Sequence, residues 1–183
     1  MLSKPGQSTL FLQTLHGADD MPMTDAEKLF FTGGAHARAA HALVAAAQAN
    51  VHMTVPFYLL LGFSLETVLK AAYLHFGGDM KVAKDEIRHD LPKALALARD
   101  RGFEPENEQL EWLTETMAEV HRNHSFRYLT GDGDLHVAEE TNSLRILDDL
   151  VVQVGQMLYP QHDRAYWIER LTKFDADPAE EAG

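Results

Sequence analysis

The sequence feature that most constrains the fold is an apolar stretch from Val55 to Phe76. It contains about 20 residues, which is the length of a membrane span. Four polar side chains interrupt it: Ser64, Glu66, Lys70 and His75. Ionisable groups are costly inside a bilayer, and a helix that is apolar nearly all round is also typical of the centre of a bundle. We therefore predict a buried central helix and no association with a membrane.

Apolar residues elsewhere recur with helical spacing, and no segment shows the sustained alternation of a half-buried strand. Thr24 followed by Glu27 is a capping box, which predicts the start of a first helix. Gly33-Gly34 is expected to kink this helix before an alanine-rich run. The central helix is expected to start at Thr54 and to stop at Gly77-Gly78.

Signals for helix ends continue along the second half of the chain. Asp90 is expected to cap a short helix at 91–101, which Gly102 ends. Three further helices are predicted at 106–124, 140–158 and 163–172, and the segment 125–138 is predicted to be a long loop. The fold class is therefore all-α: an up-and-down helical bundle of four to five main helices plus a short C-terminal helix.

The chain has 183 residues, which suits one well-buried core. We predict an N-terminal extension at 1–23, a single helical-bundle domain at 24–172, and a disordered acidic tail at 173–183. The chain has no cysteine and no basic-then-apolar secretory pattern at its start. We predict a cytoplasmic protein.

The charge balance restricts the partners. The chain carries 28 acidic and 16 basic side chains, a formal net charge of -12. Such a surface repels an extended polyanion, so we predict no general DNA binding. A confined cleft for a nucleotide or RNA remains compatible, because charges beyond about 8–10 Å are largely screened.

The helix at 106–124 carries an apolar stripe made of Leu110, Leu113, Met117 and Val120. A rotation of about 100° per residue places His121 and His124 on this stripe and points Arg122 elsewhere. The two imidazoles could be hydrogen-bonded core residues. They could also line a polar cleft, in which His124 with Arg122 or Arg127 serves acid–base or phosphate-binding roles. Arg122, His124 and Arg127 are therefore the candidate catalytic residues.

The central helix contains a candidate ion pair. Glu66 and Lys70 lie at the favourable i, i+4 spacing on one face of the helix. A carboxylate in so apolar a helix needs a partner. The pair could fix the register of the helix, or it could belong to a ligand site with His121. His89-Asp90 is expected to be only a loop and cap element.

Ten histidines in the chain make a metal site a further possibility. His121 and His124 could chelate from one helical turn, with a third ligand from Glu66, His41 or His75. The spacing selects none of these three. We predict no metal ion and no cofactor.

Three segments resemble the HEPN family (higher eukaryotes and prokaryotes nucleotide-binding). GFSLETVLKAAYLHFGG at 62–78 resembles the central helix of the family, and IRHDLPKALALARDRGF at 87–103 resembles the segment that follows. HRNHSFRY at 121–128 lies where the family often ends a helix with an Arg-Tyr pair, which adds Tyr128 to the candidate ligand-binding residues. The resemblance covers roughly 35–158 and implies the all-α bundle.

Active ribonucleases of this family are metal-independent and carry an Arg followed, after four to six residues, by a His. No arginine in this sequence has a histidine at that spacing. The resemblance then implies a noncatalytic module for nucleotide or RNA binding or for dimerisation in a toxin–antitoxin or defence context. It also implies a homodimer or a nucleotidyltransferase-type partner protein. The alternatives are a divergent endoribonuclease that uses Arg122, His124 and Arg127, or a metal-dependent helical-bundle enzyme.

Overall fold

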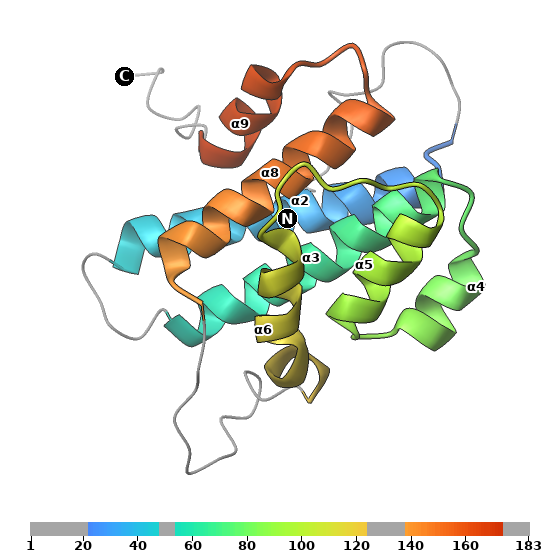
Figure 1. Ribbon diagram of the computed structural model, residues 1–183. Coiled ribbons are helices and arrows are strands. Elements are labelled where there is room, and N and C mark those ends of the chain that lie inside the picture. Colours follow the sequence, from blue (N-terminus) through green and yellow to red (C-terminus); the bar gives the residue numbers. More distant parts are fainter. Residues whose placement is uncertain (1–21, 48–53, 124–137, 174–183) are drawn as a thin grey trace, which may run out of the picture.

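The computed structural model describes residues 22–47, 54–123 and 138–173, and within these ranges it contains helices and no strand (Figure 1). In chain order the elements are α2 (Asp25–Ala47), α3 (Thr54–His75), α4 (Met80–Val82), the π-helical turn η2 (Ala83–Ile87), α5 (Leu91–Asp100), α6 (Leu110–Arg122), α8 (Glu140–Leu158) and α9 (Arg164–Thr172). The predicted all-α bundle is confirmed.

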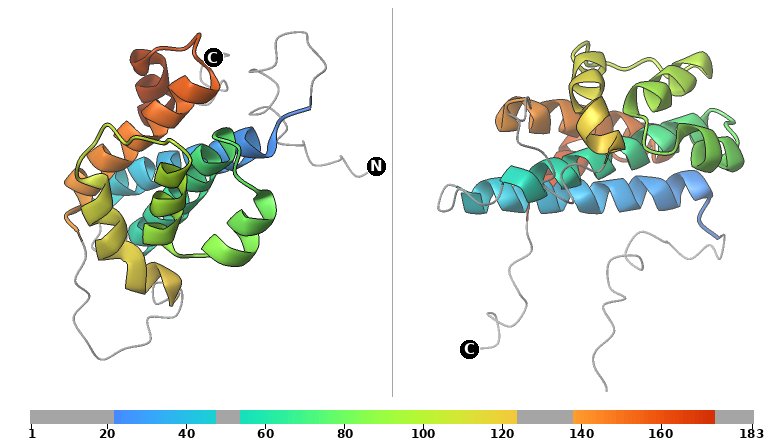
Figure 2. Two further views of the ribbon diagram at one scale, coloured as in Figure 1. Left: turned by 45° about the vertical axis from the view of Figure 1, so that its right-hand side comes forward. Right: turned by 90° about the horizontal axis from the view of Figure 1, so that it is seen from below.

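Helix α3 is the centre of this bundle, as predicted. It lies antiparallel along α2 and also contacts α5, α6, α8 and η2 (Figures 1 and 2). The segment Val55–His75 is long and apolar enough to cross a membrane, but 67% of its most apolar part is buried inside the protein. This is the placement of a core helix. A cytoplasmic location stays a prediction.

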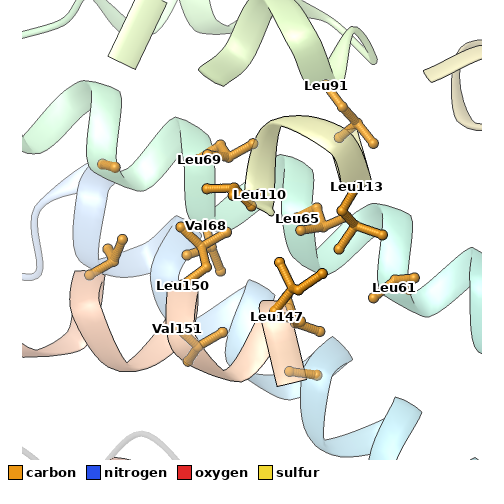
Figure 3. Packing of buried hydrophobic residues seen from close by; sticks show 14 of the residues in the cluster. Leu61, Leu65, Val68, Leu69, Leu91, Leu110, Leu113, Leu147, Leu150 and Val151 are labelled. Atoms are coloured by element: carbon orange, nitrogen blue, oxygen red, sulfur yellow. The ribbon is translucent and has the colours of Figure 1, made fainter. Parts of the chain in front are cut away.

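The core is built around the side chains of α3 (Figure 3). Leucines of α3 meet buried residues of α5, α6 and α8; the labelled members are Leu61, Leu65, Val68, Leu69, Leu91, Leu110, Leu113, Leu147, Leu150 and Val151. Burying one such side chain contributes about 1.5–3 kcal/mol. The apolar stripe predicted on α6 is therefore the face that packs into this core, with His121 at its end.

Several helix ends form as the sequence indicates. The Thr24 amide donates to Glu27 Oε2 at 2.7 Å, and the Glu27 amide donates to Thr24 Oγ1 at 3.2 Å, which completes the capping box. Asp90 accepts a hydrogen bond from the Lys93 amide at 3.1 Å and caps α5. Gly102 has a φ of +108°, which suits a glycine after a helix end.

The predicted kink at Gly33-Gly34 is wrong, because α2 is one unbroken helix from Asp25 to Ala47 (Figure 2). Gly33 instead lies tightly against α3, where an added Cβ atom would come within 2.4 Å of Val68 Cγ2. Ser64 Oγ of α3 donates to the Gly33 carbonyl oxygen at 2.7 Å. The absent side chain permits this approach, so the glycine serves packing between helices.

The fourth predicted helix starts later than expected. The segment before Leu110 is tied to α8: Gln153 accepts from the Glu106 amide at 3.1 Å and donates to the Glu104 carbonyl at 2.6 Å. These bonds replace helical ones and delay the helix. The elements α4 and η2 were not predicted. The predicted loop at 125–138 and the two predicted tails lie almost entirely outside the described residues.

Candidate functional site

A buried carboxylate organises the polar site of this bundle. Glu66 accepts a hydrogen bond from Lys70 Nζ at Oε1, over 2.7 Å. Its other oxygen, Oε2, lies 2.7 Å from His121 Nε2 and 3.0 Å from His89 Nδ1. Glu66, Lys70 and His121 are buried, whereas the His89 side chain is 40% exposed. We call these four residues the Glu66 cluster.

Three separate parts of the chain supply the cluster. Glu66 and Lys70 lie one turn apart on α3, and His121 lies in the last turn of α6. His89 lies in the turn between η2 and α5, directly after Arg88, whose φ is +50°. Lys70 Nζ also donates to the Arg88 carbonyl oxygen at 2.6 Å, so the lysine ties this strained turn to the central helix.

The cluster keeps Glu66 ionised. Burial alone would raise the pKa of this carboxyl group. The hydrogen bonds from His121, Lys70 and His89, together with the positive charge of Lys70, outweigh burial and lower the pKa from 4.5 to about 2. An ionised carboxylate only accepts hydrogen bonds, so His89 Nδ1 and His121 Nε2 must both carry protons in this arrangement.

Small and aromatic neighbours fix the His121 ring. A Cβ atom at Gly62 would lie 2.4 Å from His121 Nδ1, so only glycine leaves room for the imidazole there. The ring of Phe63 meets the His121 ring edge to face, with 5.5 Å between centroids. Phe63 also packs against His36 of α2, with 5.7 Å between ring centroids. Burial lowers the pKa of His36, and the negative charge of Glu66 opposes this.

Arg122 points away from the apolar stripe of α6, as the helical rotation predicted, and lies at the rim of the site. Its side chain is 54% exposed, and Nη2 donates to Asp90 Oδ2 at 2.8 Å. Asp90 also caps α5, so this contact joins the end of α6 to the start of α5. The exposed guanidinium of Arg122 therefore lies next to the buried His121 at the end of α6.

The structure brings together three of the predicted site residues, Glu66, Lys70 and His121. The predicted Glu66–Lys70 ion pair and the inward orientation of His121 are both confirmed. His124, Arg127 and Tyr128 lie outside the described residues, so their predicted roles stay predictions.

His89 is the member of the Glu66 cluster that was not predicted from the sequence. It was expected to be only part of a loop and cap element, and Asp90 does act as the cap. The only local signal was an imidazole directly before that capped helix. Its contact with Glu66 spans 23 positions in the sequence, and a capping pattern carries no information about such a contact.

The residues that could bind a metal ion differ from those that the sequence suggested. Within the described ranges, atoms of Glu66, His89 and His121 lie within 4.8 Å of one another and could hold a metal ion. His41 instead pairs with Asp148, with 2.7 Å between Nε2 and Oδ1. His75 is exposed and packs against Phe76. Neither belongs to the Glu66 cluster.

No family model matches the chain, and no curated protein and no solved structure matches it either. The HEPN resemblance, the homodimer and the nucleotidyltransferase-type partner therefore stay predictions from the sequence.

Proposed function

We propose that this protein binds a phosphate-bearing ligand, a nucleotide or a short stretch of RNA, at the exposed edge of the Glu66 cluster. The observation that carries the proposal is the convergence of two imidazoles and one ammonium group on one buried carboxylate. Structural ion pairs need one partner, whereas this carboxylate has three. Clusters of perturbed ionisable groups are common at functional sites.

The exposed edge offers suitable chemistry for phosphate. His89 is partly exposed, and Arg122 lies on the same side through its contact with Asp90. A guanidinium can bind phosphate oxygens in a bidentate manner, and a protonated imidazole that donates one N–H to Glu66 can donate its second N–H to a phosphate oxygen. The phosphate would compete with Asp90 for Arg122, so ligand binding would break the contact between Arg122 and Asp90.

The acidic surface limits the size of the ligand. With a net charge of -12, the protein repels a long nucleic acid, while a short ligand interacts mainly with the local groups. The noncatalytic role and the toxin–antitoxin or defence context rest on the HEPN resemblance together with the missing Arg-to-His spacing. We therefore favour recognition over turnover.

Binding can be measured with fluorescently labelled nucleotides and a short labelled RNA, in EDTA so that metal ions do not contribute. We expect saturable binding that weakens roughly 10-fold or more in His89→Ala and in Arg122→Ala, because each removes a donor to phosphate. Arg99→Ala is a matched control, since Arg99 makes a 2.8 Å pair with Glu111 that also joins α5 to α6. Absence of binding, or equal binding by all three variants, contradicts the proposal.

A second candidate function is metal-independent RNA cleavage by acid–base catalysis. It is favoured by the hydrogen bond between His89 Nδ1 and Glu66, because this bond holds the ring so that Nε2 is its basic nitrogen. With a fluorogenic RNA in EDTA, we expect His89→Ala to abolish any cleavage. Loss of cleavage in His124→Ala, with His89→Ala still active, would assign the reaction to the segment after α6 instead.

A further inference from the structure

We infer that Glu66, His89 and His121 form a binding site for one divalent transition-metal ion, with Zn²⁺ as the probe. One carboxylate oxygen and two imidazole nitrogens from three different elements meet within 4.8 Å of one another. No metal was expected from the sequence, because its spacing selects none of Glu66, His41 and His75 as a further ligand beside His121 and His124. The structure places Glu66 beside His121 and adds His89, which the sequence places in a loop.

The distances fit with a small adjustment. Bonds of about 2.1 Å in a tetrahedral zinc site place the ligand atoms roughly 3.4 Å apart. His121 Nε2 and His89 Nδ1 now lie 2.7 Å and 3.0 Å from Glu66 Oε2. Opening these contacts by about half an ångström makes room for the ion. Rotation of the partly exposed His89 ring can supply much of this movement.

The surroundings orient the ligands as the outer shell of a metal site does. Lys70 Nζ occupies Glu66 Oε1, so the carboxylate offers only Oε2 to an ion. The Arg88 carbonyl holds Lys70 in place at 2.6 Å. Gly62 and Phe63 fix the position of the His121 ring. Partners of this kind set the orientation and affinity of metal ligands.

The donor set indicates the class of ion. Two imidazoles and one carboxylate suit Zn²⁺, Co²⁺, Ni²⁺, Fe²⁺ or Mn²⁺, whereas Ca²⁺ and Mg²⁺ prefer a set made of oxygens. Three protein ligands leave at least one position for water or another ligand. The His89 side chain is 40% exposed, so this ligand lies at the surface of the site.

This inference goes beyond the proposed function and does not depend on it. Phosphate binding in EDTA uses the donors of His89 and Arg122, whereas metal binding needs Glu66 and His121 and does not need Arg122. Either kind of binding, to phosphate or to metal, can therefore be absent while the other is present. A protein that binds Zn²⁺ and no nucleotide supports only the metal site, and the reverse result supports only the phosphate site.

The experiment uses the full chain without a histidine tag, stripped with EDTA and then dialysed. Zn²⁺ is titrated by calorimetry with a competing chelator, and Co²⁺ is titrated by its visible absorption. We expect one ion per chain, and roughly 100-fold weaker binding in His89→Ala, because a ligand is lost. His75→Ala is the matched control, since His75 is an exposed histidine at the end of α3.

His121→Ala removes a buried ligand and can fail to fold, so His89→Ala, at a partly exposed position, is the deciding variant. Arg122→Ala should bind Zn²⁺ as the wild-type protein does. Weak binding of several ions per chain, equal in His89→Ala and His75→Ala, would mean adventitious histidine binding and would overturn the inference. So would the absence of binding by both Zn²⁺ and Co²⁺.

Discussion

Replacing Glu66 with alanine is expected to lower the free energy of unfolding by roughly 3–5 kcal/mol, because it leaves a buried charge without its partner. Lys70 is 8% exposed and would keep only the Arg88 carbonyl as an acceptor. The buried Nε2 of His121 would lose the acceptor that it has in the cluster. An unsatisfied buried donor adds about 1–3 kcal/mol to the loss.

Urea unfolding followed by circular dichroism measures this effect. Glu111→Ala is the matched control, because Glu111 also accepts from a cation at 2.8 Å but its side chain is 56% exposed. Exposed pairs contribute about 0–1 kcal/mol, so this variant should lie close to the wild type. Equal losses in Glu66→Ala and Glu111→Ala would mean that the cluster does not stabilise the fold.

The contribution of Glu66 to the free energy of unfolding depends on pH. The pKa of Glu66 is lowered to about 2 in the folded protein, so its contribution is complete above about 4.5 and is lost as the pH falls toward 2. This lowering corresponds to roughly 3 kcal/mol of stability. In protein stripped of metal, the difference in stability between the wild type and Glu66→Gln should therefore narrow from pH 4.5 downward.

The sequence could predict the contacts that lie within one helix. Glu66 and Lys70 are four positions apart on an apolar helix, and a charge buried there needs an oppositely charged partner within reach. His121 was placed by the spacing of the apolar stripe on its own helix. Both predictions use only the regular geometry of a helix, and the structure confirms both.

The residues that the sequence analysis misjudged depend on contacts between elements. His89 reaches Glu66 because η2 and the positive φ of Arg88 turn the chain toward α3, and no local pattern indicated η2. Gly33-Gly34 follows a local rule for a helix break, but the surface of α3 decides what the first glycine does. In both cases the deciding contact comes from a distant part of the sequence.

Gly33 and Gly34 offer a test in which two adjacent glycines should respond in opposite directions to alanine. A Cβ atom at Gly33 would lie 2.4 Å from Val68 Cγ2 and 2.7 Å from Thr67 Oγ1. Both are β-branched side chains with little rotational freedom on a helix, and Val68 is fully buried. Gly33→Ala should therefore destabilise the protein by about 1–3 kcal/mol, as overpacking does.

At Gly34 an added Cβ atom would meet nothing within 4 Å. Gly34→Ala should therefore stabilise the protein by about 0.5–1 kcal/mol, because alanine has the higher helix propensity. Thermal and urea unfolding of the two variants measure the difference, and the shared change in propensity cancels between them. If α2 and α3 do not meet at Gly33, both alanines will stabilise the helix alike. Opposite signs would place a tight contact between the two helices at Gly33, against the same part of α3 that carries Glu66.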